Sequence, residues 1–217
     1  MMLDKIFPKI HEEGYKFLVI SAVVTLILWL ISNFFGFIFT LITIWVYYFF
    51  RDHERIIIED DSYLVSPADG RISAIGEVNG PIELGLNDKK FTRVSIFMNV
   101  FDCHVNRSPS NGEIEDIFYK PGKFLNASLD KASEENERNY FKIKDKKTGE
   151  QIVVVQIAGL IARRIVTTVE KTQGVNQGQR LGMIRFGSRV DIYYSNRKTM
   201  VKLGQNVIAG ESLIARI

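Results

Sequence analysis

The feature that most constrains this 217-residue chain is an uncharged stretch of 34 residues, from Phe17 to Phe50. A single helix of that length would measure about 51 Å, whereas the hydrocarbon core of a bilayer is about 30 Å thick. Turn signals occur near the middle of the stretch, at Ser32–Asn33 and Gly36. The sequence therefore predicts a hairpin of two apolar helices, near Tyr15 to Ile31 and Phe34 to Phe50.

Positive charges flank this stretch and are absent from its middle, with Lys5, Lys9 and Lys16 before it and Arg51 and Arg55 after it. By the positive-inside rule, both ends of a membrane hairpin then lie in the cytoplasm. Each helix would be about 25 Å long, so the hairpin either spans a locally thinned bilayer or enters and leaves on one side. A cleaved signal peptide is disfavoured because its apolar region is much shorter. We therefore expect a protein of the cell membrane whose soluble domain is cytoplasmic.

The remaining composition excludes several classes of function. Lysine and arginine total 28 against 25 for aspartate and glutamate, and this net charge of +3 provides no strong basic field for a nucleic acid. The single cysteine, Cys103, cannot form an intrachain disulfide, and His11, His53 and His104 are too scattered for a local zinc motif. The sequence therefore predicts no metal site and no nucleic-acid partner.

Residues after the apolar stretch predict a mainly β soluble domain, because short Val-, Ile-, Phe- and Tyr-rich segments alternate with turn residues. The candidate strands are Arg71 to Val78, Phe91 to Met98, Glu113 to Tyr119, Tyr140 to Lys144, Gln151 to Ala158, Arg164 to Glu170, Met183 to Tyr194, Thr199 to Leu203 and Ser212 to Ile217. Lys123 to Asn139 reads as a loop with a helical turn. Val201 to Gly210 is similar to the hairpins of lipoyl and biotinyl domains, which favours a barrel-sandwich-like fold. The predicted domains are a membrane-anchoring hairpin at 1–52 and this domain at 53–217.

A Gly-Ser pair, Gly187–Ser188, lies inside a segment that otherwise reads as one strand. The structural interpretation of such a pair is a bulge with a solvated serine. The chemical interpretation is that the Ser188 hydroxyl attacks the carbonyl carbon of Gly187, which has no side chain to obstruct the approach. The resulting ester would break by β-elimination, and the dehydroalanine left behind would hydrolyse to a pyruvoyl group. Such a carbonyl can withdraw electrons during the decarboxylation of an amino acid, as pyridoxal phosphate does.

Further motifs follow the apolar stretch along almost the whole chain. They are Phe49–Arg55 (FFRDHER), Ser66–Gly70 (SPADG), Asn99–Arg107 (NVFDCHVNR), Pro121–Asn139 (PGKFLNASLDKASEENERN), Gln156–Arg164 (QIAGLIARR) and Arg185–Ser188 (RFGS). In this order they resemble the membrane-associated, short-form phosphatidylserine decarboxylases, a family whose archaeal members are thought to act on archaetidylserine. The resemblance implies a self-cleaving proenzyme, cut between Gly187 and Ser188 into chains 1–187 and 188–217.

The same resemblance implies roles for three residues. Ser188 would become the covalent pyruvoyl cofactor, Asp69 would act in self-processing, and His104 would move a proton near the pyruvoyl group, as a histidine can near neutral pH. Judged by residue type alone, Asp69 is an ordinary turn aspartate and His104 a buried core histidine. It is the match to whole motifs that favours the catalytic interpretation of both.

Two positions depart from the longer members of that family. Arg107 stands where those members carry a second histidine, regarded as the self-processing base. Either His104 therefore serves both self-processing and decarboxylation, or Asp69 acts in self-processing with less help. Arg189 stands where the longer members carry threonine. In this position the short-form members share the pattern of this chain. Cys103 beside His104 could suggest a thiol nucleophile. Neighbours on a strand point to opposite faces, however, and cannot easily share a proton, so Cys103 reads as a small buried residue.

Together, the residues and the resemblance predict a membrane-bound lyase. It would hold the amine of phosphatidylserine or archaetidylserine as a Schiff base on the pyruvoyl group, release CO₂ and leave the ethanolamine-headed lipid. Its partners would be that lipid, the bilayer and its own two cleaved chains, and the sequence indicates no oligomeric state. The cations available for the lipid phosphate are Lys123, Lys131, Arg138, Arg163 and Arg164. The alternative is a non-enzymatic, membrane-tethered binding module of lipoyl-like fold.

Overall fold

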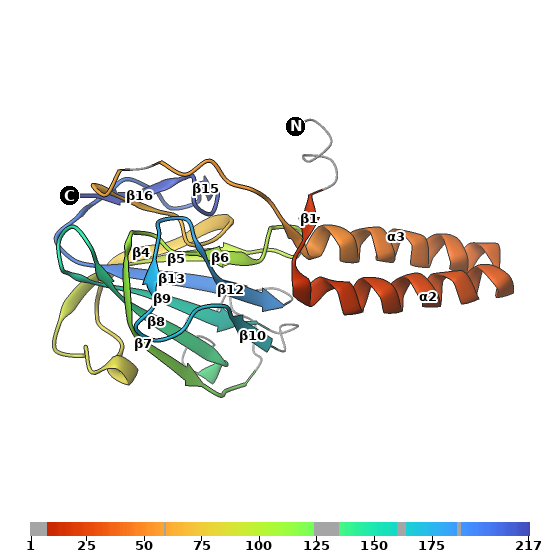
Figure 1. The fold of residues 1–217 in the computed structure, drawn as a ribbon, viewed down its shortest axis with the longest axis horizontal. Helices are drawn as coiled ribbons and strands as arrows, with labels where there is room; N and C mark the ends of the chain where they lie inside the picture. The colour runs from red at the N-terminus through yellow and green to blue at the C-terminus, as the bar shows by residue number, and fades with distance from the viewer. Residues whose placement is uncertain (1–7, 59, 124–134, 160–163, 186–187) are drawn as a thin grey trace. The chain divides into compact units, whose positions relative to one another are not determined.

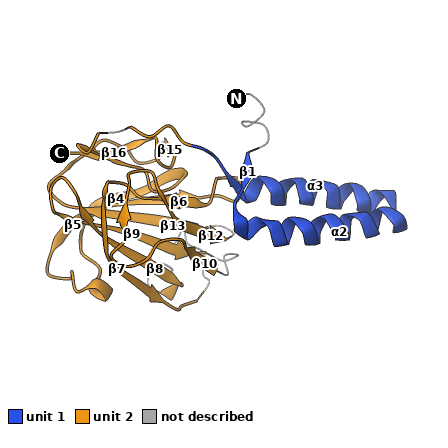
Figure 2. Ribbon diagram, viewed as in Figure 1, with its two compact units in different colours: residues 1–54 blue, residues 55–217 orange. Residues whose placement is uncertain are grey.

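The computed structural model of this chain describes all residues except 1–7, 59, 124–134, 160–163 and 186–187 (Figure 1). The chain divides into two compact units, Met1–Glu54 and Arg55–Ile217 (Figure 2). The first unit contains the apolar stretch and is mostly helical. The second is built of antiparallel strands.

The first unit is a helical hairpin made of α2 (Tyr15–Ile31) and α3 (Asn33–Phe49). Ser32 joins the two helices in an extended conformation, with φ −161° and ψ 129°, which ends one helix and starts the next. The helix bounds agree with the predicted ones to within one residue. The flanking elements are the 3-10 turn η1 (Glu12–Gly14) and the paired strands β1 (Lys9–Ile10) and β2 (Arg51–Asp52).

Small and polar side chains line the interface between the two helices. Thr25 Oγ1 lies 2.9 Å from Thr43 Oγ1, and Trp29 Nε1 donates to Thr40 Oγ1 at 3.1 Å. A Cβ atom at Gly36 would overlap the Trp29 ring, so only glycine allows this approach. The exposed apolar side chains include Val19, Ile20, Leu26, Leu30, Phe34 and Phe37. A soluble amphipathic hairpin would bury its apolar faces instead, whereas small and polar interfaces are typical of helix pairs in lipid.

The second unit contains one large antiparallel sheet and two small ones. The large sheet has the strand order β11 (Gly174–Val175), β7 (Gly112–Lys120), β8 (Arg138–Asp145), β9 (Gln151–Ala158), β13 (Ser188–Tyr194), β5 (Lys90–Met98), β4 (Gly70–Asn79) and β15 (Asn206–Val207). The small sheets are β10 (Arg164–Thr167), β12 (Arg180–Arg185) and β6 (Val105–Arg107), and β14 (Lys198–Thr199), β16 (Leu213–Arg216) and β3 (Tyr63–Val65). A 3-10 turn, η2 (Ile82–Leu84), precedes β5.

A single main core joins the three sheets. It contains Val190 and Ile192 from the large sheet, Ile184 from one small sheet and Ile214 from the other, all fully buried. Strands of different sheets therefore pack on one apolar interior, as in a sandwich. A smaller apolar cluster lies on the opposite face of the large sheet, and Tyr193 packs against it. Tyr193 faces this way because side chains alternate between the two faces along β13. The prediction of a mainly β, barrel-sandwich-like domain is confirmed.

A buried ion pair lies on that opposite face of β13. Arg189 and Asp191 are two residues apart, and two hydrogen bonds of 2.8 Å join the guanidinium to the carboxylate, with side chains 3% and 1% exposed. Removal of the Asp191 carboxylate would leave the Arg189 charge buried without its partner. We therefore expect Asp191→Asn to lower the free energy of unfolding by about 3–5 kcal/mol. Urea unfolding in detergent micelles, followed by circular dichroism, would measure the loss.

A matched control for that substitution is Asp116→Asn, which removes the carboxylate of an exposed pair with Lys171. Exposed pairs contribute at most about 1 kcal/mol. Equal losses for Asp191→Asn and Asp116→Asn would contradict the stabilising role of the buried pair.

Several sequence-based element assignments were wrong. Met183 to Tyr194 is not one strand: β12 ends at Arg185 and β13 begins at Ser188, and these two strands belong to different sheets. Of the predicted strand Thr199 to Leu203, only Thr199 is in a strand. The three-residue strands β3 and β6 were missed because they are too short to show alternation. Most of the predicted loop Lys123 to Asn139 lies outside the described residues, and its last two residues belong to β8.

Candidate active site around the start of β13

Ser188 is the first residue of β13, in the middle of the large sheet. Its backbone is in register with Ala158, the last residue of β9, on one side and with Met98, the last residue of β5, on the other. Gly187 lies outside the described residues. Ser188 therefore begins a strand that is paired on both sides, and the segment that reads as one continuous strand is divided between two sheets.

His104 lies beside the last residues of β12, which lead to the Gly-Ser pair. The His104 carbonyl accepts a hydrogen bond from the Ile184 amide at 3.2 Å. The side chain is 0% exposed, and Nδ1 lies 2.9 Å from the Asp102 carbonyl oxygen. Because a carbonyl can only accept, Nδ1 carries the proton, which leaves Nε2 of the neutral ring as its basic nitrogen.

Cys103 and His104 precede β6 and do not lie on a strand, so the argument from opposite strand faces does not apply to them. The prediction that Cys103 is a small buried residue is nevertheless confirmed, because its side chain is 2% exposed.

A chain of buried amides links the strand that follows His104 to the strands that flank Ser188. Asn106 Oδ1 accepts from Gln156 Nε2 at 2.8 Å, and Asn106 Nδ2 lies 3.8 Å from Met98 Sδ. Gln156 Oε1 accepts from Asn139 Nδ2 at 3.2 Å, and the same Nδ2 lies 3.3 Å from Thr167 Oγ1. Buried polar networks of this kind fix strands in one arrangement. The sequence analysis missed these residues, although amides within otherwise apolar strands, such as Gln156, were a visible signal.

Asp69 occupies a tight turn at the same end of the sheet. Ser66 Oγ donates to the Ala68 carbonyl oxygen at 2.7 Å, and the turn ends at Gly70 with φ +147°. A Cβ atom at Gly70 would overlap the carbonyl oxygen of Phe97, so this position requires glycine. The start of β4 and Ser188 lie two strands apart across the end of β5, which corresponds to about 10 Å.

The described partners of the Asp69 carboxylate are Arg55 and a backbone amide. Arg55 Nη2 lies 3.0 Å from Oδ1 and 2.7 Å from Oδ2, and the Ala209 amide donates to Oδ1 at 2.7 Å. Burial opposes the charge of Arg55, yet the acidic groups around it, with Asp69 first among them, together outweigh burial and raise the pKa of the guanidinium above its ordinary value. Asp69 is thus a fixed carboxylate with a permanent cationic partner.

Arg107, at the position where longer relatives carry a second histidine, is buried and points toward a loop. Its Nη1 donates to the Gly178 carbonyl oxygen at 2.9 Å. Its backbone amide donates to the Pro67 carbonyl oxygen at 2.9 Å, and this bond ties the turn that carries Asp69 to β6. The same strand therefore connects the segments of His104 and Asp69.

Of the five cations considered for a lipid phosphate, Lys131 and Arg163 lie outside the described residues. Lys123 and Arg138 lie 3.0 Å and 3.7 Å from carboxylate oxygens, and Arg164 is exposed. All three adjoin residues 135–138, a segment at the Ser188 end of the sheet, since backbone bonds join it to Ala158 and Lys123. Their role in phosphate binding stays a prediction.

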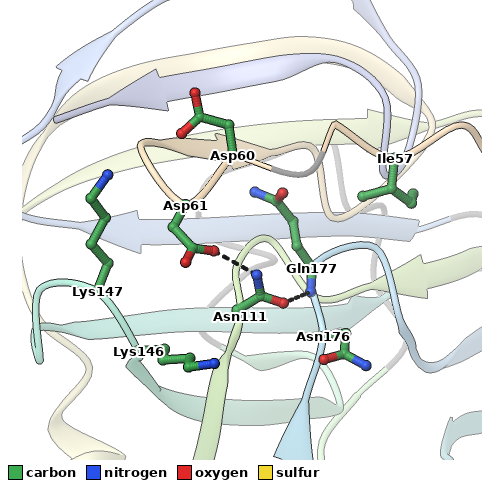
Figure 3. Close-up of a pocket in the computed structure, with 8 residues that line it drawn as sticks. All are labelled: Ile57, Asp60, Asp61, Asn111, Lys146, Lys147, Asn176 and Gln177. Carbon is green, nitrogen blue, oxygen red and sulfur yellow. Dashed lines mark hydrogen bonds between the residues drawn. The ribbon is translucent and has the colours of Figure 1, made fainter.

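A large polar cavity of about 860 Å³ lies elsewhere (Figure 3). Asp60, Asp61, Lys146 and Lys147 line it, and Asn111 connects Asp61 to the Gln177 backbone (Figure 3). The two lysines belong to the turn before β9, whereas Ser188 is paired with the last residue of β9. The length of that strand separates the two places by about 23 Å, so this cavity takes no part in the candidate site.

Comparison with known proteins decides the family. A model of the phosphatidylserine decarboxylase family matches residues 42–215. The chain belongs to that family. A phosphatidylserine decarboxylase proenzyme of Pelagibacter ubique is 64% identical over 99% of this chain and 100% of its own length. Proteins of the same name from Ruegeria pomeroyi and Cereibacter sphaeroides are 51% and 50% identical over 99% of this chain, and over 98% and 92% of their own lengths. Membership of an enzyme family disfavours the non-enzymatic binding module.

Proposed function

We propose that this chain is a self-processing decarboxylase that converts phosphatidylserine to the ethanolamine-headed lipid and CO₂. The observation that carries the proposal is the 64% identity, over the full length, to a protein named phosphatidylserine decarboxylase proenzyme. The matched family region includes Asp69, His104 and Ser188. The names of the three bacterial relatives favour phosphatidylserine over archaetidylserine as the substrate.

Self-cleavage would begin with attack of the Ser188 hydroxyl on the carbonyl carbon of Gly187. The position of Ser188 at the start of β13 supports this step, since the cut would fall at the end of a strand and leave the residues after it paired with β5 and β9. Asp69, held about 10 Å away across the sheet, would assist the cleavage. The products would be a large chain 1–187 and a small chain 188–217.

A pyruvoyl group derived from Ser188 would supply the electron-withdrawing carbonyl that loss of CO₂ from an amino acid requires. The site fits such a group, because residue 188 is paired on both sides and the end of β13 would be fixed after the cut. His104 would hold and deliver the proton that the α carbon takes up after CO₂ has left. Because Nδ1 bonds to the Asp102 carbonyl, Nε2 of the buried ring would be the nitrogen that first takes up this proton and then passes it on.

The helical hairpin would anchor the protein in the cell membrane, as residues 1–52 of a two-domain chain whose decarboxylase domain is residues 53–217. The segment Glu12–Ile31 is long and apolar enough to cross a bilayer. The polar interface between α2 and α3 and the exposed apolar side chains support insertion into lipid. The lysines and arginines that flank the hairpin favour a cytoplasmic location for the decarboxylase domain.

The experiment that tests the proposal is mass spectrometry of the purified full-length protein. We expect two chains, with the smaller one starting at a pyruvoyl group in place of Ser188. Addition of borohydride in the presence of phosphatidylserine should trap the lipid amine covalently on the small chain. One intact chain in a folded preparation, or a small chain that borohydride never modifies, would overturn the proposal.

A further inference from the structure

The motif FFRDHER ends at Arg55, the first residue of the second unit, and the proposed chemistry has given this arginine no role. In the structure the Arg55 guanidinium contacts both oxygens of the Asp69 carboxylate, at 3.0 Å and 2.7 Å. The two side chains are 9% and 14% exposed. This pair therefore connects two motifs that lie apart in the sequence, and it is mostly excluded from water.

The segment that follows Arg55 is fastened to the same region. The Ile56 amide donates to Glu211 Oε1 at 3.2 Å. The Ile57 side chain fits against Gly178 and Gly210, whose φ angles are +76° and +79°, and a Cβ atom on either glycine would overlap it. Arg55 is thus fixed in place by its neighbours and does not depend on the ion pair alone for its position.

Arg55 also lies close to the strand that follows the candidate histidine. A Cβ atom at Gly210 would lie 3.6 Å from Arg55 Cβ and 3.4 Å from Arg107 Cδ. Arg107 belongs to β6, which begins directly after His104.

We propose that Arg55 is a positioning residue for self-cleavage, which holds the Asp69 carboxylate in one orientation. The inference rests on the proposed role of Asp69 in cleavage. The fixed guanidinium leaves Asp69 little freedom to turn, because the Ala209 amide holds one of the same oxygens.

The turn that carries Asp69 is itself held in place. It bonds to β6 through the Arg107 amide and to the segment 208–212 through Ser66.

The test is the rate of self-cleavage of the full-length chain, synthesised in a cell-free system with detergent micelles. Appearance of the chain 188–217 gives the rate. In Arg55→Gln the rate at a fixed pH should fall by about 10²-fold, because misplacement of a group by about 1 Å can cost that much. Arg55→Lys should recover part of the rate, because it retains the charge but not the planar geometry.

A matched control is Arg197→Gln, which breaks the buried pair of Arg197 with Asp145, where Nη2 lies 2.9 Å from Oδ2 and both side chains are at most 2% exposed. Asp145 is the last residue of β8, at the end of the sheet away from Ser188. This variant should unfold at a lower temperature but cleave at the wild-type rate, which separates a loss of stability from a loss of positioning.

The outcomes separate the inference from the proposed function. If Asp69→Asn blocks cleavage while Arg55→Gln keeps the original rate, the inference is overturned and the proposed function stands. If Arg55→Gln does not fold, a wild-type rate in Arg55→Lys overturns the inference, because that variant lacks the planar guanidinium. If Asp69→Asn cleaves normally, both the role of Asp69 and the inference fail, whereas an uncut wild-type chain overturns the proposed function itself.

Discussion

Ser188→Ala should yield a single uncut chain with no measurable decarboxylase activity. The hydroxyl is both the nucleophile for cleavage and the source of the pyruvoyl carbonyl, so its loss removes both steps at once. The backbone of residue 188 is paired on both sides, and alanine can keep that pairing. Intact-mass spectrometry and release of labelled CO₂ from the serine carboxylate of phosphatidylserine would measure the two effects, with circular dichroism as the check on folding.

The control is Ser195→Ala, just beyond the other end of β13, which should cut and decarboxylate like the wild type. A two-chain product from the Ser188→Ala variant would mean that the cleavage site lies elsewhere. Residual decarboxylation by an uncut chain would mean that the electron sink is not made from Ser188.

His104→Gln should lower the rate of decarboxylation by about 10²- to 10⁴-fold, the range for loss of a general acid or base. Glutamine can keep a hydrogen bond to the Asp102 carbonyl but cannot carry the mobile proton. Capture of the lipid amine should persist, so borohydride should still label the small chain of any cleaved variant. Single-turnover release of CO₂, measured on cleaved protein only, would isolate the chemical step.

The matched substitution His53→Gln, in the first unit, should leave that step unchanged. If His104→Gln remains uncut, the histidine also serves self-cleavage, which was one of the two alternatives left open by Arg107. A cleaved His104→Gln variant with a wild-type rate would show that another group delivers the proton.

The helical hairpin could be predicted from the sequence almost to the residue because its determinants are local. Charge disappears at Phe17 and returns at Arg51, and Ser32 supplies the break. The longer strands were also visible through their apolar residues and turn signals. The junction between β12 and β13 was not visible, because the apolar pattern continues through Gly187 although the two strands join different sheets.

The candidate site could be predicted only in part, because its geometry depends on contacts between distant segments. The motifs identified Asp69, His104 and Ser188 as candidates but did not indicate what surrounds them. The pairing of Asp69 with Arg55 joins residues 14 positions apart, and the amide chain through Gln156 links four strands of two sheets. No periodicity encodes such pairings, since each depends on the register of strands that are distant in the sequence.

The strands that follow the cleavage point are distributed through the whole second unit. β13 lies at the centre of the large sheet, β15 lies at its edge, and β14 and β16 complete a sheet with β3. The small chain can therefore dissociate only if the whole second unit unfolds. The two chains should copurify without any covalent link. Renaturation would then change from a unimolecular into a bimolecular reaction, and a denatured mature sample should recover poorly on dilution where the uncut Ser188→Ala chain recovers well.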